Sequence, residues 1–207
     1  MTTLRLLYTA HLNGALERLP RLYTFLKHLR HQAEAEQTLL LDLGGSCNSE
    51  SWHCAATGGR SMLIVLDAMG YAAVNAVGLS SESREKLREN FLAMALVDDL
   101  YPHQSGSICL RTAPASSLAP AALEIDLRPV SQTHFDGREL RLGLVRGDQV
   151  GAVELSLSGG IPTLEGTQIY DLSPSTLPDP TISAAVDLVL AEARLHQRRL
   201  SGEWGSD

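Results

Sequence analysis

The sequence predicts an α/β protein with a mainly parallel β-sheet and a second half that is rich in strands. In the first half, short apolar runs that end in glycine or polar residues alternate with stretches whose apolar residues recur at helical spacing. The second half carries several strand-like runs separated by turn-forming residues. Alternating strands and helices are typical of a mainly parallel sheet, and the later run of strands adds further sheet.

The N-terminal region predicts a strand, a helix and a second strand. Residues 4–9 form a short apolar run that leads into a polar loop. Between residues 17 and 35, leucines and a phenylalanine recur at helical spacing while basic residues lie on other faces, which predicts an amphipathic helix. Residues 38–43 are continuously apolar and end in two glycines, as expected of a strand that is buried on both faces.

Three further elements complete the alternating part of the chain. Residues 61–69 predict a helix that Gly70 terminates as a C-cap, and residues 72–77 predict the next strand. Residues 83–100 predict another helix, with a charged first half and an apolar second half. The functional loops of such a sheet are expected at the carboxyl ends of its strands.

The second half of the chain is predicted to be rich in strands. Asp136-Gly137 and residues 158–160 are turn signals. Residues 112–122, dense in alanine, proline and serine, are the best candidate for a mobile loop. An acidic proline turn precedes a final amphipathic helix at residues 181–200. The predicted strands cover residues 108–111, 123–130, 139–145 and 152–157.

The size and composition predict one globular domain at residues 1–200 with a frayed tail at 201–207. A chain of 207 residues with 44% hydrophobic residues is long enough to bury a substantial core. Its formal net charge of −7 disfavours binding to nucleic acid or to an anionic membrane surface. No apolar run is long enough to span a bilayer.

The start of the chain and its cysteines predict a cytoplasmic protein. The sequence enters the first predicted strand directly, without the basic and apolar regions of a secretory signal. Cys47, Cys54 and Cys109 are odd in number and too few for a dense disulfide framework, which agrees with a reducing compartment.

Three strand-to-loop junctions carry a family resemblance. They read Thr9-Ala10-His11-Leu12-Asn13-Gly14, Asp42-Leu43-Gly44-Gly45-Ser46 and Gly78-Leu79-Ser80-Ser81-Glu82. They resemble the metal-binding loops of the calcineurin-like metallophosphatases, most closely those of the bacterial 5'-nucleotidase branch. The resemblance implies a metallophosphatase-like fold, which is a layered sandwich of mixed β-sheets flanked by helices. Residues 141–155 are similar to the strands that close the catalytic domain of that family.

The resemblance also implies that the metal ligands have been replaced. His11 stands for the first aspartate of the family, Asn13 for its histidine and Gly45 for the bridging aspartate, while Leu79 and Ser80 replace an Asn-His pair. The later histidine loops and the nucleoside-binding second domain of the family are not matched either. A two-metal centre needs carboxylates and imidazoles from several strand ends. The vestigial cleft is predicted to be lined by His11, Asn13, Gly45, Ser46, Leu79 and Ser80.

These replacements predict a pseudoenzyme, a catalytically inactive metallophosphatase-fold protein that acts as a binding, regulatory or assembly subunit. A protein partner or self-association is expected, and no resident cofactor. The alternative is a divergent metal-dependent phosphoesterase or 5'-nucleotidase-like hydrolase with a reduced site. Its single divalent ion would be held by His11, Asp42 and His53, whose spacing matches no strong zinc pattern.

Four other features carry less specific hypotheses. Cys47 or Cys54 could act as a nucleophile beside His53, although sequence neighbours rarely form such a dyad, and Cys54 is otherwise a small buried hydrophobe. Gly58-Gly59-Arg60 offers backbone amides and a cation to an anion, or only a turn and a cap. Ser80 or Ser81 is expected to cap the next helix. Trp52, placed in a loop, is the candidate contact with a partner.

Overall fold

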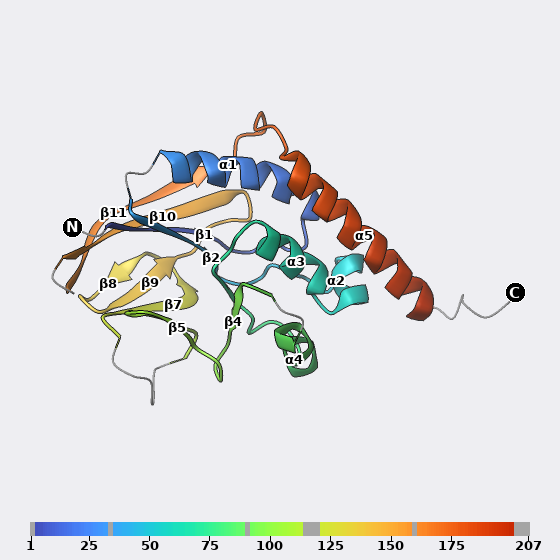
Figure 1. The fold of residues 1–207 in the computed structure, drawn as a ribbon, viewed down its shortest axis with the longest axis horizontal. Helices are drawn as coiled ribbons and strands as arrows, with labels where there is room; N and C mark the ends of the chain where they lie inside the picture. Colours follow the sequence, from blue (N-terminus) through green and yellow to red (C-terminus); the bar gives the residue numbers. More distant parts are fainter. Residues whose placement is uncertain (1–2, 33–34, 90–91, 114–120, 159–160, 201–207) are drawn as a thin grey trace, which may run out of the picture.

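The structure is a computed structural model that describes residues 3–32, 35–89, 92–113, 121–158 and 161–200. Two mixed β-sheets lie face to face, and helices cover the outer face of the larger sheet (Figure 1). The predicted layered sandwich of mixed sheets flanked by helices is confirmed. The predicted tail at 201–207 and the centre of the predicted mobile loop, residues 114–120, lie outside the described residues.

The larger sheet has six strands in the order β11-β10-β1-β2-β3-β4. The four strands from β1 to β4 are parallel, whereas β10 runs antiparallel to β1 and β11 runs antiparallel to β10. Parallel pairing places the carboxyl ends of β1, β2 and β3 at one edge of the sheet. The strands are β1 (Thr3–Thr9), β2 (Gln37–Asp42), β3 (Ala73–Asn75), β4 (Ala95–Val97), β10 (Gln149–Ser158) and β11 (Ile161–Asp171).

The smaller sheet has five strands in the order β5-β6-β7-β9-β8. Its three central strands are parallel and its two short edge strands are antiparallel. The strands are β5 (His103–Ser105), β6 (Ile108–Arg111), β7 (Leu123–Val130), β8 (His134–Phe135) and β9 (Glu139–Gly143).

The alternation of side chains along β1 divides the core into two layers. Leu4, Leu6 and Tyr8 join the apolar cluster that lies between the two sheets. Leu7 points to the opposite face and joins the cluster under the helices, where Arg5 also donates a hydrogen bond to the Leu29 carbonyl oxygen at 3.0 Å. Successive side chains of a strand point to opposite faces, so one strand supplies both layers.

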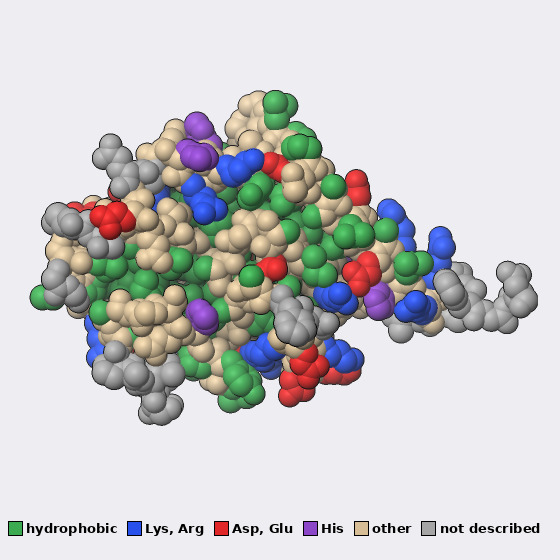
Figure 2. Space-filling view, viewed as in Figure 1, with side chains coloured by type: hydrophobic (Ala, Val, Ile, Leu, Met, Phe, Trp, Pro, Cys, Tyr) green, Lys and Arg blue, Asp and Glu red, His purple; other side chains and the backbone are tan. Residues whose placement is uncertain are grey.

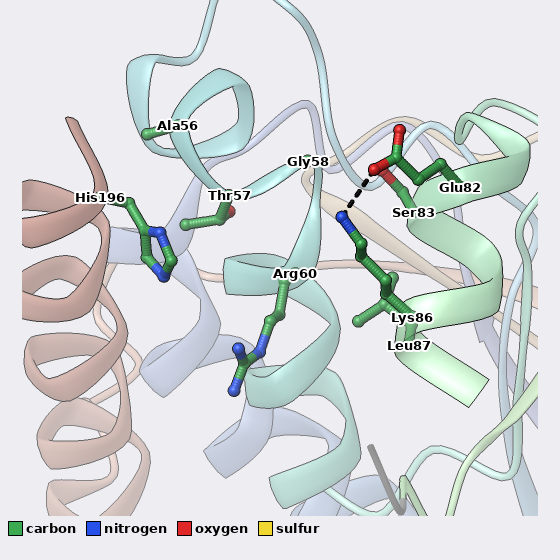
Figure 3. Close-up of a pocket in the computed structure, with 9 residues that line it drawn as sticks. All are labelled: Ala56, Thr57, Gly58, Arg60, Glu82, Ser83, Lys86, Leu87 and His196. Atoms are coloured by element: carbon green, nitrogen blue, oxygen red, sulfur yellow. Dashed lines mark hydrogen bonds and ion pairs between the residues drawn. The ribbon is translucent and has the colours of Figure 1, made fainter. Parts of the chain in front are cut away.

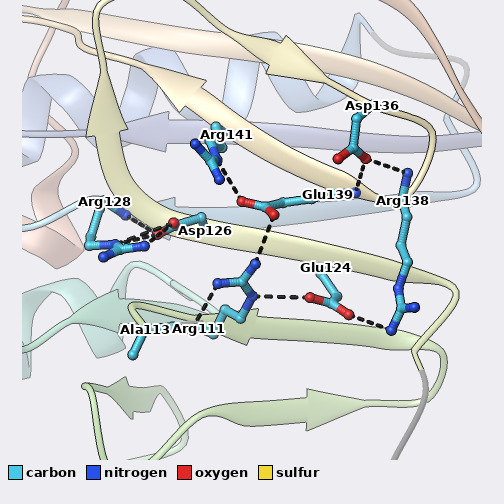
Figure 4. A network of polar contacts seen from close by, with 9 residues as sticks. All are labelled: Arg111, Ala113, Glu124, Asp126, Arg128, Asp136, Arg138, Glu139 and Arg141. Atoms are coloured by element: carbon cyan, nitrogen blue, oxygen red, sulfur yellow. Dashed lines mark hydrogen bonds and ion pairs between the residues drawn. The ribbon is translucent and has the colours of Figure 1, made fainter. Parts of the chain in front are cut away.

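A chain of ion pairs crosses the smaller sheet (Figure 4). The buried Arg111 guanidinium lies between Glu124, at 3.1 Å, and Glu139, at 3.0 Å, and also donates to the Ala113 carbonyl oxygen. Arg138 and Arg141, both about half exposed, bind the outer oxygens of the same two carboxylates at 2.6 Å. Each of these two carboxylates therefore faces cations from two sides.

Helices pack on the larger sheet and on one another. Asp179 caps the longest of them, α5, because its Oδ1 accepts hydrogen bonds from the backbone N–H groups of Thr181 and Ile182. None of the described helices is both long enough and apolar enough to cross a bilayer. The helices are η1 (Leu16–Arg18), α1 (Leu19–His31), α2 (Trp52–Thr57), α3 (Arg60–Ala68), α4 (Ser81–Glu89) and α5 (Pro180–Leu200).

The sequence-based boundaries need three corrections. The helix predicted over residues 83–100 ends at Glu89, and part of its apolar second half, Ala95–Val97, is strand β4, because parallel pairing with β3 outweighs a local helical pattern. The short helix α2, the long edge strand β11 and the short edge strands β5 and β8 were not predicted. The helix predicted over residues 17–35 is a 3-10 turn followed by α1, which ends at His31.

Candidate functional site

The loops that follow β1 and β2 are joined by backbone hydrogen bonds beyond the end of the sheet. The N–H groups of His11, Asn13 and Gly14 donate to the carbonyl oxygens of Gly44, Gly45 and Ser46 at 2.9, 2.8 and 2.7 Å. The β1–β2 pairing thus continues into the loops. His11 and Asn13 reach this arrangement with φ of 51° and 53°, in the left-handed region that non-glycine residues seldom occupy.

The imidazole of His11 lies over Gly45. A Cβ atom added to Gly45 would lie 2.7 Å from His11 Nδ1, and the φ of Gly45 is 71°. Any side chain at residue 45 would therefore have to displace the imidazole and adopt a strained backbone. The His11 imidazole occupies the space into which a side chain at residue 45 would project.

Asp42 is the buried centre of a hydrogen-bond network beneath these loops. Its carboxylate accepts bonds from Ser46 Oγ at 2.5 Å, from Thr9 Oγ1 at 2.8 Å and from the Gly44 N–H group at 3.0 Å. Thr9 Oγ1 also lies 3.1 Å from the Tyr71 hydroxyl. Burial raises the pKa of Asp42 to about 6 against the lowering effect of these bonds, and burial followed by the nearby Asp42 charge raises the pKa of Tyr71.

His53 is a structural residue of the site. It lies on α2, not in the predicted loop, and is 5% exposed. Its Nε2 donates to the Gly14 carbonyl oxygen at 2.9 Å, and its Nδ1 lies 2.8 Å from Ser61 Oγ. Because a carbonyl oxygen only accepts, the proton belongs on Nε2 and Nδ1 accepts from the serine hydroxyl. Both nitrogens are used in fixing α2 to the first loop and to α3.

Cys47 and Cys54 form a disulfide, which corrects the interpretation of both as thiols. The bond joins the second loop to α2, with the two Cα atoms 5.8 Å apart. Cys54 is therefore neither a lone buried hydrophobe nor a nucleophile in this oxidised state. Cys109 is buried on β6 as a free thiol.

Reduction of this disulfide is expected to lower the free energy of unfolding by about 2 to 3 kcal/mol, because the bond restricts a short loop in the unfolded chain. Urea unfolding with and without dithiothreitol measures the loss. The Cys47→Ala/Cys54→Ala variant is the matched control, since dithiothreitol should leave its midpoint unchanged. A wild-type midpoint that does not respond to dithiothreitol would contradict the cross-link.

The third loop lies beside the second loop and beside the turn between α2 and α3. Leu79 packs against the core under the helices, and its Cδ2 is the atom nearest to where a Cβ of Gly59 would lie. A small cavity of about 40 Å³ lies beside Gly45, Ser46 and Leu79. Ser80 is exposed and its Oγ accepts the Ser83 N–H group at 3.1 Å, which agrees with the predicted cap.

Asn75 is a residue of this site that the sequence interpretation missed. Its Nδ2 donates to the carbonyl oxygens of Leu43 and Leu127, both at 3.2 Å, so it joins the second loop to the smaller sheet. Its Oδ1 accepts from the Val77 N–H group at 3.0 Å. The available signal was a single polar side chain at the carboxyl end of an apolar strand.

Comparison with known proteins shows which fold this chain shares with solved structures. No family model matches the sequence, and no curated protein matches it. Among solved structures, the calcineurin-like phosphoesterase YfkN from Bacillus subtilis aligns with a TM-score of 0.62 at 9% identity, covering 93% of this chain and 98% of YfkN. The NAD nucleotidase NadN from Haemophilus influenzae aligns with a TM-score of 0.63 at 11% identity, covering 96% of this chain and 61% of NadN. The chain has the calcineurin-like phosphoesterase fold.

The metal ligands suggested for this calcineurin-like chain are not brought together. Asp42 is enclosed by three hydrogen-bond donors, and both ring nitrogens of His53 are engaged elsewhere, so neither is available beside His11. Across the part of the chain that the structure describes, no three His, Cys, Asp or Glu side chains converge as a metal centre requires. The residues present do not fit the metal site of this fold.

The predicted anion site lies in a pocket of about 360 Å³ between α2, α3, α4 and α5 (Figure 3). Arg60 lines it but pairs with Glu192 at 3.1 Å, and Lys86 pairs with Glu82 at 2.6 Å. The carboxylates compete with any anion for these two cations. Anion binding here stays a prediction that mixed charge disfavours.

Trp52 is the first residue of α2 and not part of a loop, which corrects its predicted setting. Its side chain is 39% exposed, and its ring meets the His53 ring edge-on, with centroids 5.8 Å apart. One side of the indole is thus packed on the site and the other faces solvent. The role of Trp52 as a partner contact stays a prediction.

Proposed function

We propose that this chain is a noncatalytic member of the calcineurin-like fold class, which acts as a binding, regulatory or assembly subunit. The observation that carries the proposal is that the candidate metal ligands do not converge, because Asp42 is bonded to its own loop and to Thr9, and His53 is bonded to Gly14 and Ser61. The His11 imidazole lies beside Gly45 at the exposed edge of the sheet, and Leu79 lies against Gly59.

The chemistry of the remaining side chains supports the same proposal. Hydrolysis of a phosphoester by this fold needs a metal-activated water held by several charged ligands. Asp42 is buried at the end of β2 and bonded to its own loop, and His53 serves the packing of α2. The matched enzymes YfkN and NadN support the fold, and their activities are not carried over to a chain with these residues.

The competing function is a divergent phosphoesterase with a reduced metal site. We expect protein purified without chelator to contain less than stoichiometric Mn, Fe, Zn or Co by elemental analysis. We also expect no turnover of p-nitrophenyl phosphate or its bis ester above the buffer rate with added Mn²⁺. Stoichiometric metal together with turnover that His11→Ala abolishes would overturn the proposal. His134→Ala, at an exposed histidine on the smaller sheet, is the matched control.

In the proposed assembly role, Trp52 contacts the partner protein. An aromatic side chain that is half packed and half exposed can anchor a partner without first rearranging. Its test is the Trp52→Ala variant, whose assembly is compared with that of wild type by sedimentation. Unchanged assembly would remove Trp52 from the contact.

The cytoplasmic location is a separate proposal. It was predicted in part from the cysteine count, and the Cys47–Cys54 disulfide removes that argument, because such bonds persist mainly in oxidising compartments. Alkylation of free thiols in intact cells, followed by mass measurement, distinguishes a reducing compartment from an oxidising one. Free thiols at both residues would support the cytoplasm, and a uniformly intact disulfide would contradict it.

A further inference from the structure

Helix α5 carries apolar stripes on two opposite faces. One stripe is buried, where α5 packs against α1, α2 and α3. The second stripe lies two residues further along the helix, which turns it by about 200° and places it on the outside. The buried stripe is Ile182, Val186, Val189 and Ala193, and the exposed stripe is Ala184, Leu188, Ala191 and Leu195.

The outer stripe has the spacing of a helix-pairing seam. Its members are four, three and four residues apart, as in the apolar positions of a heptad. Leu188 is 69% exposed and Leu195 is 46% exposed. In Figure 1, α5 lies along the outer edge of the molecule, and in Figure 2 hydrophobic side chains interrupt the charged surface along it. Single exposed leucines are ordinary, but a regular stripe on both sides of one helix is typical of a helix that is covered on both sides.

We infer that the exposed stripe of α5 packs against the same stripe of a second copy of this chain, with the two helices antiparallel. The alternation of side-chain size favours this partner. In the antiparallel register, Leu188 lies against Ala191 of the second copy, and Leu195 lies against Ala184. Every layer then combines one large and one small side chain, so the two helices approach evenly. A parallel pair would stack leucine on leucine and leave the alanine layers underfilled.

The flanking charges favour the same orientation. Asp187 and Arg194 are exposed and seven residues apart, so they lie on one flank of the stripe. Antiparallel helices bring Asp187 of one copy beside Arg194 of the other, twice about the twofold axis. Parallel helices would instead place Asp187 beside Glu192, and Arg194 beside Arg199, and both contacts are repulsive. The surface is therefore complementary to itself in one orientation only.

The expected dimer is weak. The stripe from Ala184 to Leu195 spans about 16 Å at 1.5 Å per residue, so the two helices alone bury an area at the low end of specific interfaces. We expect the dimer to have a dissociation constant of about 10 µM, as a small and weak interface would give. The dimer rests on the assembly role proposed above, but its contact is made by α5 and does not include Trp52.

Sedimentation equilibrium over about 1 to 200 µM tests the dimer, because that range brackets the expected affinity. We expect wild type to pass from monomer to dimer and Leu188→Glu to weaken association at least tenfold. Leu188 is exposed, so the variant should fold, which circular dichroism checks. Ile161→Glu, at a residue of β11 that is also 69% exposed, is the matched control and should associate as wild type does.

A charge exchange tests the orientation. Asp187→Arg should weaken the dimer about tenfold, and Asp187→Arg/Arg194→Asp should restore it, since both cross-pairs reform only in an antiparallel pair. Wild type that stays monomeric would overturn the inference, as would a dimer that survives Leu188→Glu or depends instead on Trp52 or Ile161. A dimer strengthened by Asp187→Arg would be parallel and would overturn it too. The metal and esterase assays are unaffected by these substitutions, so the two proposals fail separately.

Discussion

Replacing Arg111 by methionine is expected to lower the free energy of unfolding by about 3 kcal/mol, because it leaves the buried Glu124 and the partly buried Glu139 without the cation between them. The Arg111 side chain is 7% exposed, and the two carboxylates are 12% and 20% exposed. The outer ion pairs with Arg138 and Arg141 persist in the variant. The loss in free energy of unfolding is therefore expected at the lower end of the range seen when one partner of a buried ion pair is removed. In thermal unfolding the loss corresponds to about 6 to 12 °C in Tm.

Arg141→Met is the matched control for this prediction. It removes a cation from the same Glu139 carboxylate, but the Arg141 side chain is 49% exposed, and an exposed pair contributes about 1 kcal/mol or less. Adding Glu124→Gln and Glu139→Gln to the Arg111→Met chain should recover part of its stability, since the uncompensated charges are then gone. Equal losses for Arg111→Met and Arg141→Met would show that the central pair is not the stabilising one.

The sequence predicts more of the architecture than of the details of the site. Alternating apolar runs and amphipathic helices determine which segments pair and which face of each is buried, so the parallel strands β1, β2 and β3 and their shared loop edge followed from the pattern. The strand β4 did not, because Ala95–Val97 follows a charged helix without a strong turn signal and is held by its pairing with β3. Pairing between distant segments outweighs propensity in so short an element.

The chemistry of the site depended on contacts that no local pattern encodes. Cys47 and Cys54 lie seven residues apart, and only the turn into α2 brings their sulfur atoms together. His53 resembled a ligand in sequence, yet its environment is a carbonyl oxygen and a hydroxyl group. The glycines were more informative than the ligand types, because a residue with positive φ, such as Gly45, restricts which side chains its loop can carry.

The stability of the protein is expected to fall as the pH rises from about 4 to about 6, by up to about 3 kcal/mol from Asp42 alone. Burial raises the pKa of this carboxyl to about 6, against its ordinary value of 3.8. The folded chain therefore keeps the proton over a pH range in which the unfolded chain has lost it. Below the ordinary pKa the effect is fully stabilising, and above about pH 6 it has disappeared.

Asp42→Asn is expected to remove this slope and to be more stable than wild type at pH 7. The amide can accept from Ser46 and Gly44 through its oxygen and donate one N–H to Thr9, whose hydroxyl then donates to Tyr71, so each of these contacts keeps a donor and an acceptor without a buried charge. Urea unfolding of both proteins from pH 4 to pH 8 measures the difference, and parallel curves would contradict it. A metal ligand would behave in the opposite way. Added Mn²⁺ would then stabilise wild type at pH 7 and not the Asp42→Asn variant, because a ligand carboxylate must be ionised to bind.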